Sequence, residues 1–267
     1  MKIFTWNEIK DDIERDYSKS FFKQGSGISI GSFDGLHKGH RVLLNTLVDY
    51  CRKNKLLSGV VSFSRPLPSV KHKEDYQGDI STLDQRLKLF ESLGIDFAVI
   101  VDFDESFASI KGIDFLTMLV NGCNMKYLAE GIDFRCGHLG STDASSIKLF
   151  AENNGIKYDF VDPVFYDNGT EQERISSSYI RSMVLKRFFS TAEELLERLY
   201  SIQIKVNSEG QVFSREITSQ AIPPEGAYRC MLDGEEIRVE ITQNDIICHF
   251  TDSQKYKNGD LIDISFI

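Results

Sequence analysis

Two histidines, His37 and His40, stand three residues apart in a glycine-rich segment whose residue types suit the handling of a polyphosphate. The segment reads Gly-Ser-Phe-Asp-Gly-Leu-His-Lys-Gly-His-Arg over residues 31–41. Histidine side chains can donate hydrogen bonds that stabilise the charge developing when an α-phosphoryl group is attacked and pyrophosphate leaves. Such a transfer depends on positioning and charge stabilisation rather than on a covalent nucleophile. The glycines let the backbone approach a phosphate closely.

Residue types alone leave three interpretations of this segment open: a nucleotide site, a metal site and a purely structural glycine-rich turn. An H-x-x-H pair occurs in metal sites, but no third or fourth ligand of suitable type stands nearby. The segment follows a predicted strand and runs directly into a predicted helix, whose first N–H groups can bind phosphate. The position between a strand and a helix therefore favours nucleotide binding.

A second candidate phosphate site is formed by three serines, Ser176, Ser177 and Ser178, between Arg174 and Arg181. Ser176 or Ser177 is a good helix N-cap. The first N–H groups of that helix can donate hydrogen bonds to an anion, and an arginine can bind a phosphate through two hydrogen bonds. The alternative is an ordinary serine-capped helix that carries surface arginines.

The elements that would position these residues alternate between strands and helices up to about Tyr200. We expect strands at residues 27–33, 57–63 and 97–101 and helices at 40–54 and 81–93, and the segments 115–120, 127–132, 145–153 and 158–161 continue this alternation. A further helix is predicted to open with a capping box, Ser190 to Glu193. This alternation predicts an α/β domain with a parallel sheet covered by helices. Ligands of such sheets bind beyond the carboxyl ends of the strands, where residues 31–41 would lie.

The pattern changes after Tyr200. Short β candidates at residues 202–206, 228–232, 237–241, 246–250 and 261–266 are separated by turn signals, which predicts a small antiparallel β-barrel-like domain. We therefore expect two domains, residues 1–200 and 201–267. A short helix is expected around residues 8–17.

Composition limits the classes of partner. The net charge of −9 argues against general affinity for nucleic acid or anionic membranes. No apolar tract is long enough to span a bilayer, and the first residues become polar too early for a signal peptide, so we expect a cytoplasmic protein. The five cysteines show no C-x-x-C spacing, which argues against a disulfide framework. The sequence does not reveal the oligomeric state.

The segment at residues 31–41 resembles the G-x-F-D-G-x-H-x-G-H signature of the FMN adenylyltransferase module in prokaryotic bifunctional riboflavin kinase/FAD synthetases, which belong to the HxGH nucleotidylyltransferases. Other segments are similar to further motifs of that family in the same order: residues 81–86 with 93–96, residues 103–108 with 115–116, residues 131–137, and residues 174–181. The resemblance extends over nearly all of residues 27–200.

The resemblance implies a Rossmann-like domain that transfers AMP from ATP to FMN and uses Mg²⁺. It implies catalytic roles for His37, His40, Ser177 and Arg181. It implies contacts with ATP by Gly31, Phe33, Asp34, Gly39, Arg174 and Ser178. It implies contacts with flavin by Phe63, Pro66, Asp133 and Phe134, and Asp133 is also the candidate that positions magnesium.

The chain also departs from the family pattern. The usual F-x-P-H-P stretch reads Phe-Ser-Arg-Pro-Leu-Pro at residues 63–68, and Cys136 stands where an aromatic residue is common. The kinase motif G-F-P-T-A-N is absent after Tyr200, so we expect a truncated or degenerate kinase-like domain without riboflavin kinase activity. Two alternatives stay open: a nucleotidylyltransferase acting on another phosphorylated acceptor, and a catalytically weak flavin- or nucleotide-binding protein.

Overall fold

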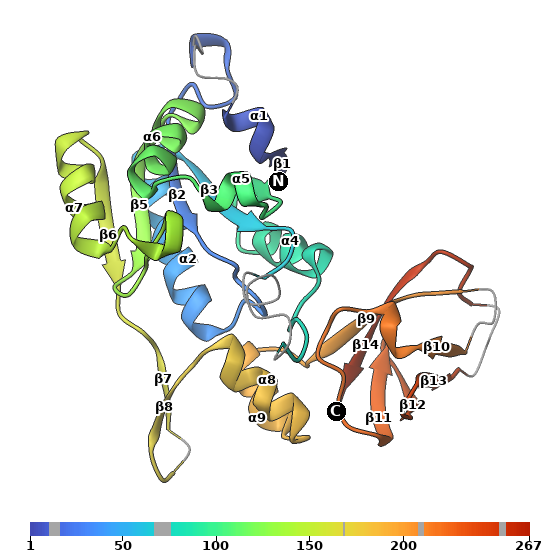
Figure 1. Cartoon of the computed structure of the whole chain (residues 1–267). Helices are drawn as coiled ribbons and strands as arrows, with labels where there is room; N and C mark the ends of the chain where they lie inside the picture. The colour runs from blue at the N-terminus through green and yellow to red at the C-terminus, as the bar shows by residue number, and fades with distance from the viewer. Residues whose placement is uncertain (11–16, 67–75, 168, 208–210, 251–254) are drawn as a thin grey trace. The chain divides into compact units, whose positions relative to one another are not determined.

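The computed structural model describes residues 1–10, 17–66, 76–167, 169–207, 211–250 and 255–267, and it forms two compact units (Figure 1). The first unit comprises Met1–Phe33, Gly39–Lys71 and Leu83–Val164. The second comprises Asp34–Lys38, His72–Thr82 and Phe165–Ile267. Two short segments of the chain therefore belong to the second unit before residue 165. One is part of the glycine-rich segment (residues 34–38), and the other precedes the helix that begins at Leu83 (residues 72–82).

The first unit is built on a parallel sheet of six strands in the order β1-β4-β3-β2-β5-β6. The strands are β1 (Lys2–Thr5), β2 (Ser26–Ile30), β3 (Leu57–Phe63), β4 (Phe97–Val101), β5 (Met125–Gly131) and β6 (Lys157–Val161). Nearly every residue of β2, β3 and β4 is buried, as the continuous apolar sequence of β4 predicts for a central parallel strand. The strand order reverses between β2 and β5, and ligands of open α/β sheets bind at such a switch point.

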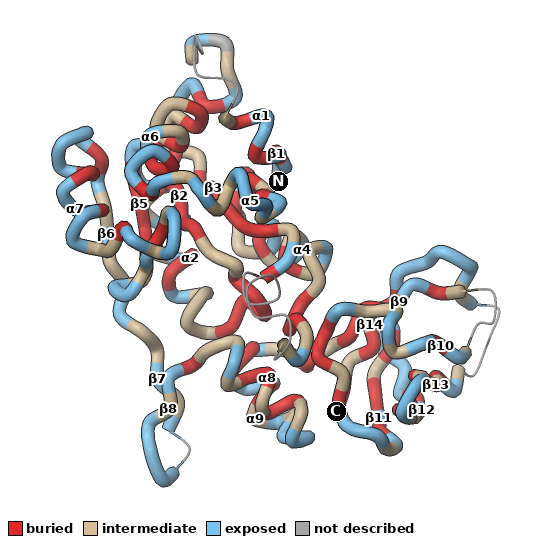
Figure 2. Tube along the Cα trace, in the orientation of Figure 1, coloured by how far each residue is buried: buried red, intermediate tan, exposed pale blue. Residues whose placement is uncertain are grey.

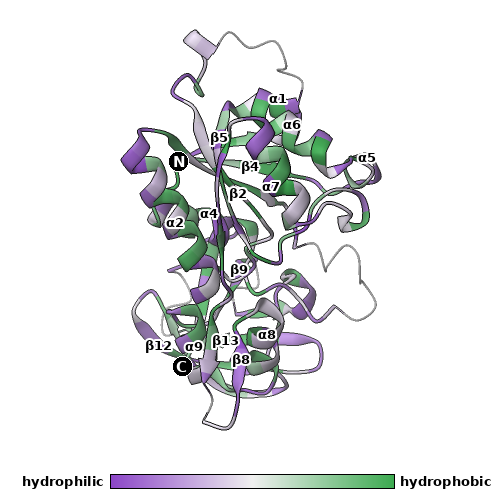
Figure 3. Cartoon of the chain, turned by 90° about the vertical axis from the view of Figure 1, so that its left-hand side faces the viewer, coloured by the Kyte–Doolittle hydropathy of each residue, from purple (hydrophilic) through white to green (hydrophobic). Residues whose placement is uncertain are grey.

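Helices cover both faces of this sheet (Figure 3). Helices α1 (Trp6–Lys10), α6 (Gly112–Cys123) and α7 (Ala144–Asn153) cover one face, and their apolar side chains form one core with alternate strand residues. Helices α2 (Lys38–Asn54) and α4 (Leu83–Ser92) cover the other face. Gly27 of β2 permits the close approach of α2, because a Cβ there would lie 2.4 Å from Cys51 Sγ. A short helix, α5 (Glu105–Ala108), follows β4.

The second unit contains two helices, a two-stranded hairpin and an antiparallel sheet. The helices are α8 (Ser177–Leu185) and α9 (Phe189–Leu196), and the hairpin pairs β7 (Phe165–Asp167) with β8 (Gln172–Arg174). The sheet has the order β10-β13-β12-β11-β14-β9 and is barrel-like and nearly closed. Its strands are β9 (Ser201–Lys205), β10 (Val212–Ser214), β11 (Gly226–Leu232), β12 (Glu235–Ile241), β13 (Asp245–His249) and β14 (Leu261–Phe266). Burial alternates along β11 and β12, which matches one face packed and one face exposed (Figure 2).

The predicted fold class, a parallel α/β domain followed by a small antiparallel β-barrel-like domain, is confirmed. One detail differs. Helix α9 begins at Phe189 with Phe188 at the N-cap and no side-chain cap, so the predicted capping box at Ser190 is wrong. Residues 165–200 form part of the second unit, and the domain boundary at Tyr200 stays a prediction. Residues 11–16 of the helix expected around residues 8–17 lie outside the described residues.

None of the helices in the described part of the chain is long and apolar enough to cross a bilayer.

Candidate active site

The glycine-rich segment adopts a strained backbone. Phe33, Gly35 and Leu36 have φ angles of 47°, 77° and 40°, all in the left-handed region. Two of these are non-glycine residues, for which that region costs free energy and which persist there only when surrounding contacts hold them. Residues 33–37 are all buried. The segment is thus held in a defined conformation, as a preorganised binding loop requires.

Asp34 supplies several of those holding contacts within the second unit. Its carboxylate accepts hydrogen bonds from the backbone N–H groups of Ile80 (2.8 Å) and Ser81 (3.0 Å). It also forms a buried ion pair with Arg181, whose Nη2 lies 3.0 Å from Oδ2. The backbone N–H of Gly35 donates to Ser81 Oγ at 2.8 Å. Asp34 therefore fastens residues 34–35 to residues 80–81.

Arg181, predicted as a catalytic phosphate ligand, lies inside the second unit. Besides Asp34, its guanidinium donates through Nε to Gly78 O at 2.5 Å and lies 4.9 Å from the ring centroid of Tyr76. The side chain is buried. These contacts give both Arg181 and Asp34 a structural part in ordering the segment, and the roles toward ATP that the resemblance implies for them stay predictions.

The start of α8 is attached to the same segment. Ser176 is the N-cap, because its Oγ accepts from the N–H of Tyr179 at 3.2 Å. Ser177 Oγ donates to the backbone oxygen of Asp34 at 2.8 Å. Ser178 is exposed in the first turn, and Arg174 is exposed just before the helix. The second unit thus brings residues 34–37 together with the start of α8, as the phosphate-site prediction requires.

His37 is buried in a positively charged environment. Burial, and then the charges of Arg174 and Arg198, lower its pKa to about 4. The imidazole is therefore neutral at physiological pH and can donate one hydrogen bond. Arg198 was not predicted; its Nη2 donates to Gly35 O at 2.6 Å. Its place in sequence, within the turn after α9, carried no motif that would have identified it.

The residues from Gly39 onwards belong to the first unit. Gly39 and His40 are the second and third residues of α2, which begins at Lys38, two residues before the predicted start. The ring of His40 packs edge-on against Phe33, with the ring centroids 5.3 Å apart. His40 therefore lies in the first turn of a 17-residue helix, where the helix dipole favours an anion.

Arg86 of α4 is a further residue whose role the sequence did not indicate. It is completely buried, and its Nη1 donates to the backbone oxygens of Ser32 (2.9 Å) and Phe63 (2.8 Å). Its Nη2 donates to Ser64 O at 3.0 Å. Arg86 thereby joins the start of the glycine-rich segment to the end of β3.

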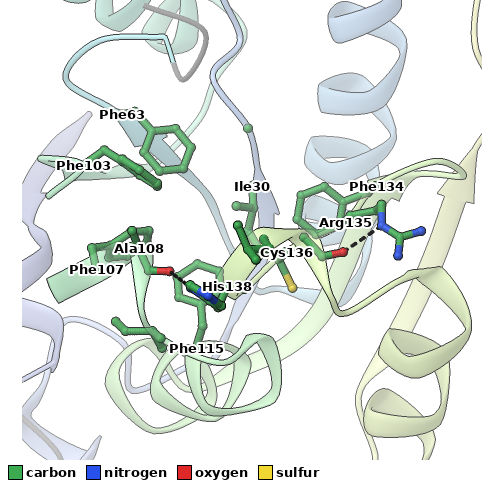
Figure 4. A pocket seen from close by; sticks show the side chains of 15 residues that line it. Ile30, Phe63, Phe103, Phe107, Ala108, Phe115, Phe134, Arg135, Cys136 and His138 are labelled. Carbon is green, nitrogen blue, oxygen red and sulfur yellow. Dashed lines mark hydrogen bonds between the residues drawn. The ribbon is translucent and has the colours of Figure 1, made fainter. Parts of the chain in front are cut away.

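An apolar pocket of about 410 Å³ lies in the first unit (Figure 4). Its walls follow the carboxyl ends of four neighbouring strands, β2, β3, β4 and β5. The lining consists of five phenylalanines, other apolar residues and a loop at residues 135–140. The phenylalanines are Phe63, Phe103, Phe107, Phe115 and Phe134. The volume falls in the range of ligand pockets, and the flat aromatic walls suit a planar ring system.

The pocket contains some of the predicted flavin contacts. Phe63 and Phe134 line it, and so does Gly31, which was predicted to contact ATP. Pro66, which is buried, and Asp133, which is exposed in the turn after β5, are not among the lining residues. Leu67 and Pro68 of the altered stretch lie outside the described residues.

A buried carboxyl group lies behind the pocket wall. Glu130 Oε1 accepts a hydrogen bond from the backbone N–H of Ile30 at 2.7 Å, and Ile30 and Cys136 line the pocket. Complete burial raises the pKa of Glu130 well above its ordinary value. Burial raises the pKa of the Cys136 thiol to about 12, and the nearby Glu130 contributes to this increase. The Cys136 thiol is therefore neutral at physiological pH, and burial favours the protonated form of Glu130.

Candidate metal ligands are sparse. The described residues contain no group of three or more His, Cys, Asp or Glu side chains that could hold a metal ion. Mg²⁺ commonly binds proteins through one or two carboxylates together with substrate phosphates. The exposed carboxylate of Asp133 fits that limited role and no larger one.

Comparison with known proteins identifies related sequences. A family model described as FAD synthetase matches residues 20–179. The bifunctional riboflavin kinase/FMN adenylyltransferase of Buchnera aphidicola subsp. Schizaphis graminum is 31% identical over 183 residues, 68% of this chain and 57% of that protein. The protein of the same description from Escherichia coli K12 is 30% identical over 188 residues, 69% of this chain and 58% of that protein. This chain thus spans less than two thirds of the length of these relatives.

Two further comparisons extend beyond residue 179. The FAD synthetase of Listeria monocytogenes is 26% identical over 205 residues, 76% of this chain and 79% of that protein. A crystal structure described as a macrolide-efflux protein from Streptococcus pneumoniae aligns with a TM-score of 0.72 and 20% identity, and it covers 91% of this chain and 92% of that chain. At this identity the second likeness concerns the fold alone.

Proposed function

Because the chain belongs to the FAD synthetase family, we propose that it transfers AMP from ATP to FMN, giving FAD and pyrophosphate. The observation that carries the proposal is the aromatic pocket beyond the carboxyl ends of β2 to β5, which has the size and walls for a planar ring system. The relatives described as FMN adenylyltransferases and FAD synthetase support the same assignment.

The proposed chemistry needs no strong base, because the FMN phosphate is already ionised near neutral pH. Its oxygen attacks the α-phosphorus of ATP. His37, which is neutral, and His40, at the start of α2, donate hydrogen bonds to the phosphate oxygens as charge develops on them. Arg174, Ser177 and Ser178 add positive charge and donors at the start of α8.

Arg181 and Asp34 act in this proposal as positioning residues, since both side chains are committed to the buried ion pair. Magnesium enters with ATP as part of the substrate, and Asp133 is the candidate protein ligand. We propose no riboflavin kinase activity, because the second unit lacks the kinase motif in its sequence.

The proposal is tested by incubating the purified protein with ATP and Mg²⁺ in two parallel reactions, one with FMN and one with riboflavin, and separating the flavins by chromatography. FAD from FMN, with riboflavin unchanged, is the expected result. Conversion of riboflavin to FMN would overturn the kinase part alone. In a third reaction, other phosphate esters replace FMN as the acceptor. Faster turnover with one of these esters than with FMN would overturn the acceptor assignment.

A further inference from the structure

His138 presents a hydrogen-bond acceptor at the edge of the aromatic pocket. The residue lines the pocket, and its Nδ1 lies 3.0 Å from the backbone oxygen of Ala108 (Figure 4). A carbonyl oxygen only accepts, so Nδ1 carries the proton and donates it. The neutral ring then has Nε2 as its acceptor. Within the described part of the chain, the bond to Ala108 is the only hydrogen bond of this imidazole.

The backbone around His138 holds the ring in position. The N–H of His138 donates to Ile110 O at 2.9 Å. The backbone and the ring of His138 are therefore both hydrogen-bonded to residues 108–110, at the end of α5. Gly137 has a φ of 77°, and a Cβ at that residue would come within 2.2 Å of the Gly112 nitrogen. The loop therefore packs against the start of α6 at a distance that only glycine allows. His138 is exposed, and these two hydrogen bonds fix the position of its imidazole at the pocket edge.

The rest of the pocket offers a ligand few polar partners. Among the lining residues, only Arg135 and His138 have side chains with nitrogen or oxygen atoms. The guanidinium of Arg135 has donors but no acceptor, and it donates to Gly140 O at 2.7 Å, pointing away from His138 (Figure 4). The Nε2 atom of His138 is therefore the strong side-chain acceptor available to an N–H group of a bound ring.

From this arrangement we infer that His138 determines which ring the pocket accepts, by taking a hydrogen bond from the imide N–H of a planar heterocycle. The inference rests on the proposed function, in which the heterocycle is the flavin and the donor is its N3–H. The apolar dimethylbenzene part then lies among the phenylalanines, and the polar pyrimidine edge faces residues 135–140. The opposite orientation would bury the imide without a hydrogen-bond partner, which is unfavourable because the group loses its bonds to water.

The test compares the binding of FMN with that of 3-methyl-FMN, in which a methyl group replaces the hydrogen on N3. Dissociation constants are measured by flavin fluorescence for the wild-type protein and for His138→Ala and His138→Phe. The wild type is expected to bind FMN roughly tenfold more tightly than 3-methyl-FMN, as one lost hydrogen bond implies. Both variants are expected to bind the two flavins with nearly equal affinity. A purely structural role for His138 would weaken both flavins together and leave the ratio unchanged.

The two variants separate hydrogen bonding from steric exclusion. His138→Phe keeps a ring of similar size, so preserved discrimination in that variant and lost discrimination in His138→Ala would assign the effect to bulk and overturn the inference. Unchanged discrimination in both variants would also overturn it, while FMN binding by the wild type would leave the proposed function standing. If the wild type bound neither flavin, the proposed function itself would fail. Emission from Trp6, the only tryptophan of the chain, checks that the first unit of each variant is folded.

Discussion

Arg181 and Asp34 are 147 residues apart in the chain and form a buried ion pair, with Nη2 3.0 Å from Oδ2. The pair joins α8 to the glycine-rich segment, and Ser177 adds a second connection through the backbone oxygen of Asp34. Hydrogen bonds therefore join the two segments of the proposed phosphate site in the second unit, which are residues 34–37 and the start of α8. Their relative positions depend on this pair.

We predict that Arg181→Gln destabilises the second unit by about 3 kcal/mol, because a buried carboxylate loses its partner. Hydrogen exchange followed by mass spectrometry should show roughly a hundredfold lower protection in α8 and in residues 76–82. Arg174→Gln is the matched control, since Arg174 is exposed. It should change stability by no more than about 0.5 kcal/mol yet lower the rate of AMP transfer. Normal protection in Arg181→Gln together with impaired transfer would instead make Arg181 a direct ligand of ATP.

His37 should remain neutral down to about pH 4 in the ligand-free protein, because burial and two arginines disfavour the imidazolium. An NMR titration of the histidine ring signals, with His37→Gln for assignment, measures this pKa. Binding of ATP should raise it, since nearby phosphates favour the charged form. A His37 signal that titrates near pH 6.5 in the ligand-free protein would show that the ring is not buried as described.

Phe134→Ala should weaken FMN binding roughly tenfold or more, because an aromatic ring stacked on a planar base contributes about 1–3 kcal/mol. ATP binding should not change. Phe165→Ala is the matched control: this phenylalanine is exposed in β7 and does not line the pocket. Fluorescence titration of FMN distinguishes the two variants. Equal FMN affinities of the two variants would show that the aromatic pocket does not bind the flavin.

The buried Glu130 predicts a specific dependence of stability on pH. Its pKa in the folded protein is raised, so between the ordinary value near 4.5 and the folded value the unfolded chain releases a proton that the folded chain keeps. Stability of the first unit should therefore fall as pH rises through this window. Glu130→Gln removes the effect, so it should become increasingly more stable than the wild type as the pH rises above 4.5. Denaturation followed by Trp6 fluorescence measures the difference, and parallel pH profiles would contradict the assignment.

Strand β4 was predictable because its sequence is continuously apolar, and β2 and β3 because short apolar runs alternate with helix-length segments along the chain. Residues 57–63 and 97–101 were predicted with the bounds that β3 and β4 have. Strand β1 was missed because it is an edge strand of four residues with one buried side chain. Strand β10, with three residues, is too short to show alternation.

The long-range contacts of the site were not predictable from local patterns. Arginine is rarely fully buried, so nothing in the sequence indicated that Arg86 or Arg181 would turn inward. Their contacts with Ser32 and Asp34 depend on which loops the sheet brings together. Phe103 and Phe107 belonged to a recognised motif, but only the three-dimensional structure places their rings in the pocket wall.

The most direct test of the proposed function is the stoichiometry of the reaction with ATP, Mg²⁺ and FMN. FAD is quantified by chromatography and pyrophosphate by a coupled assay, for the wild type and for His40→Ala. We predict one FAD and one pyrophosphate for each ATP consumed by the wild type, and a rate roughly a hundredfold lower for His40→Ala, as expected when one preorganised donor is lost. The account would be contradicted by wild-type protein that is folded and binds both ATP and FMN yet forms no FAD.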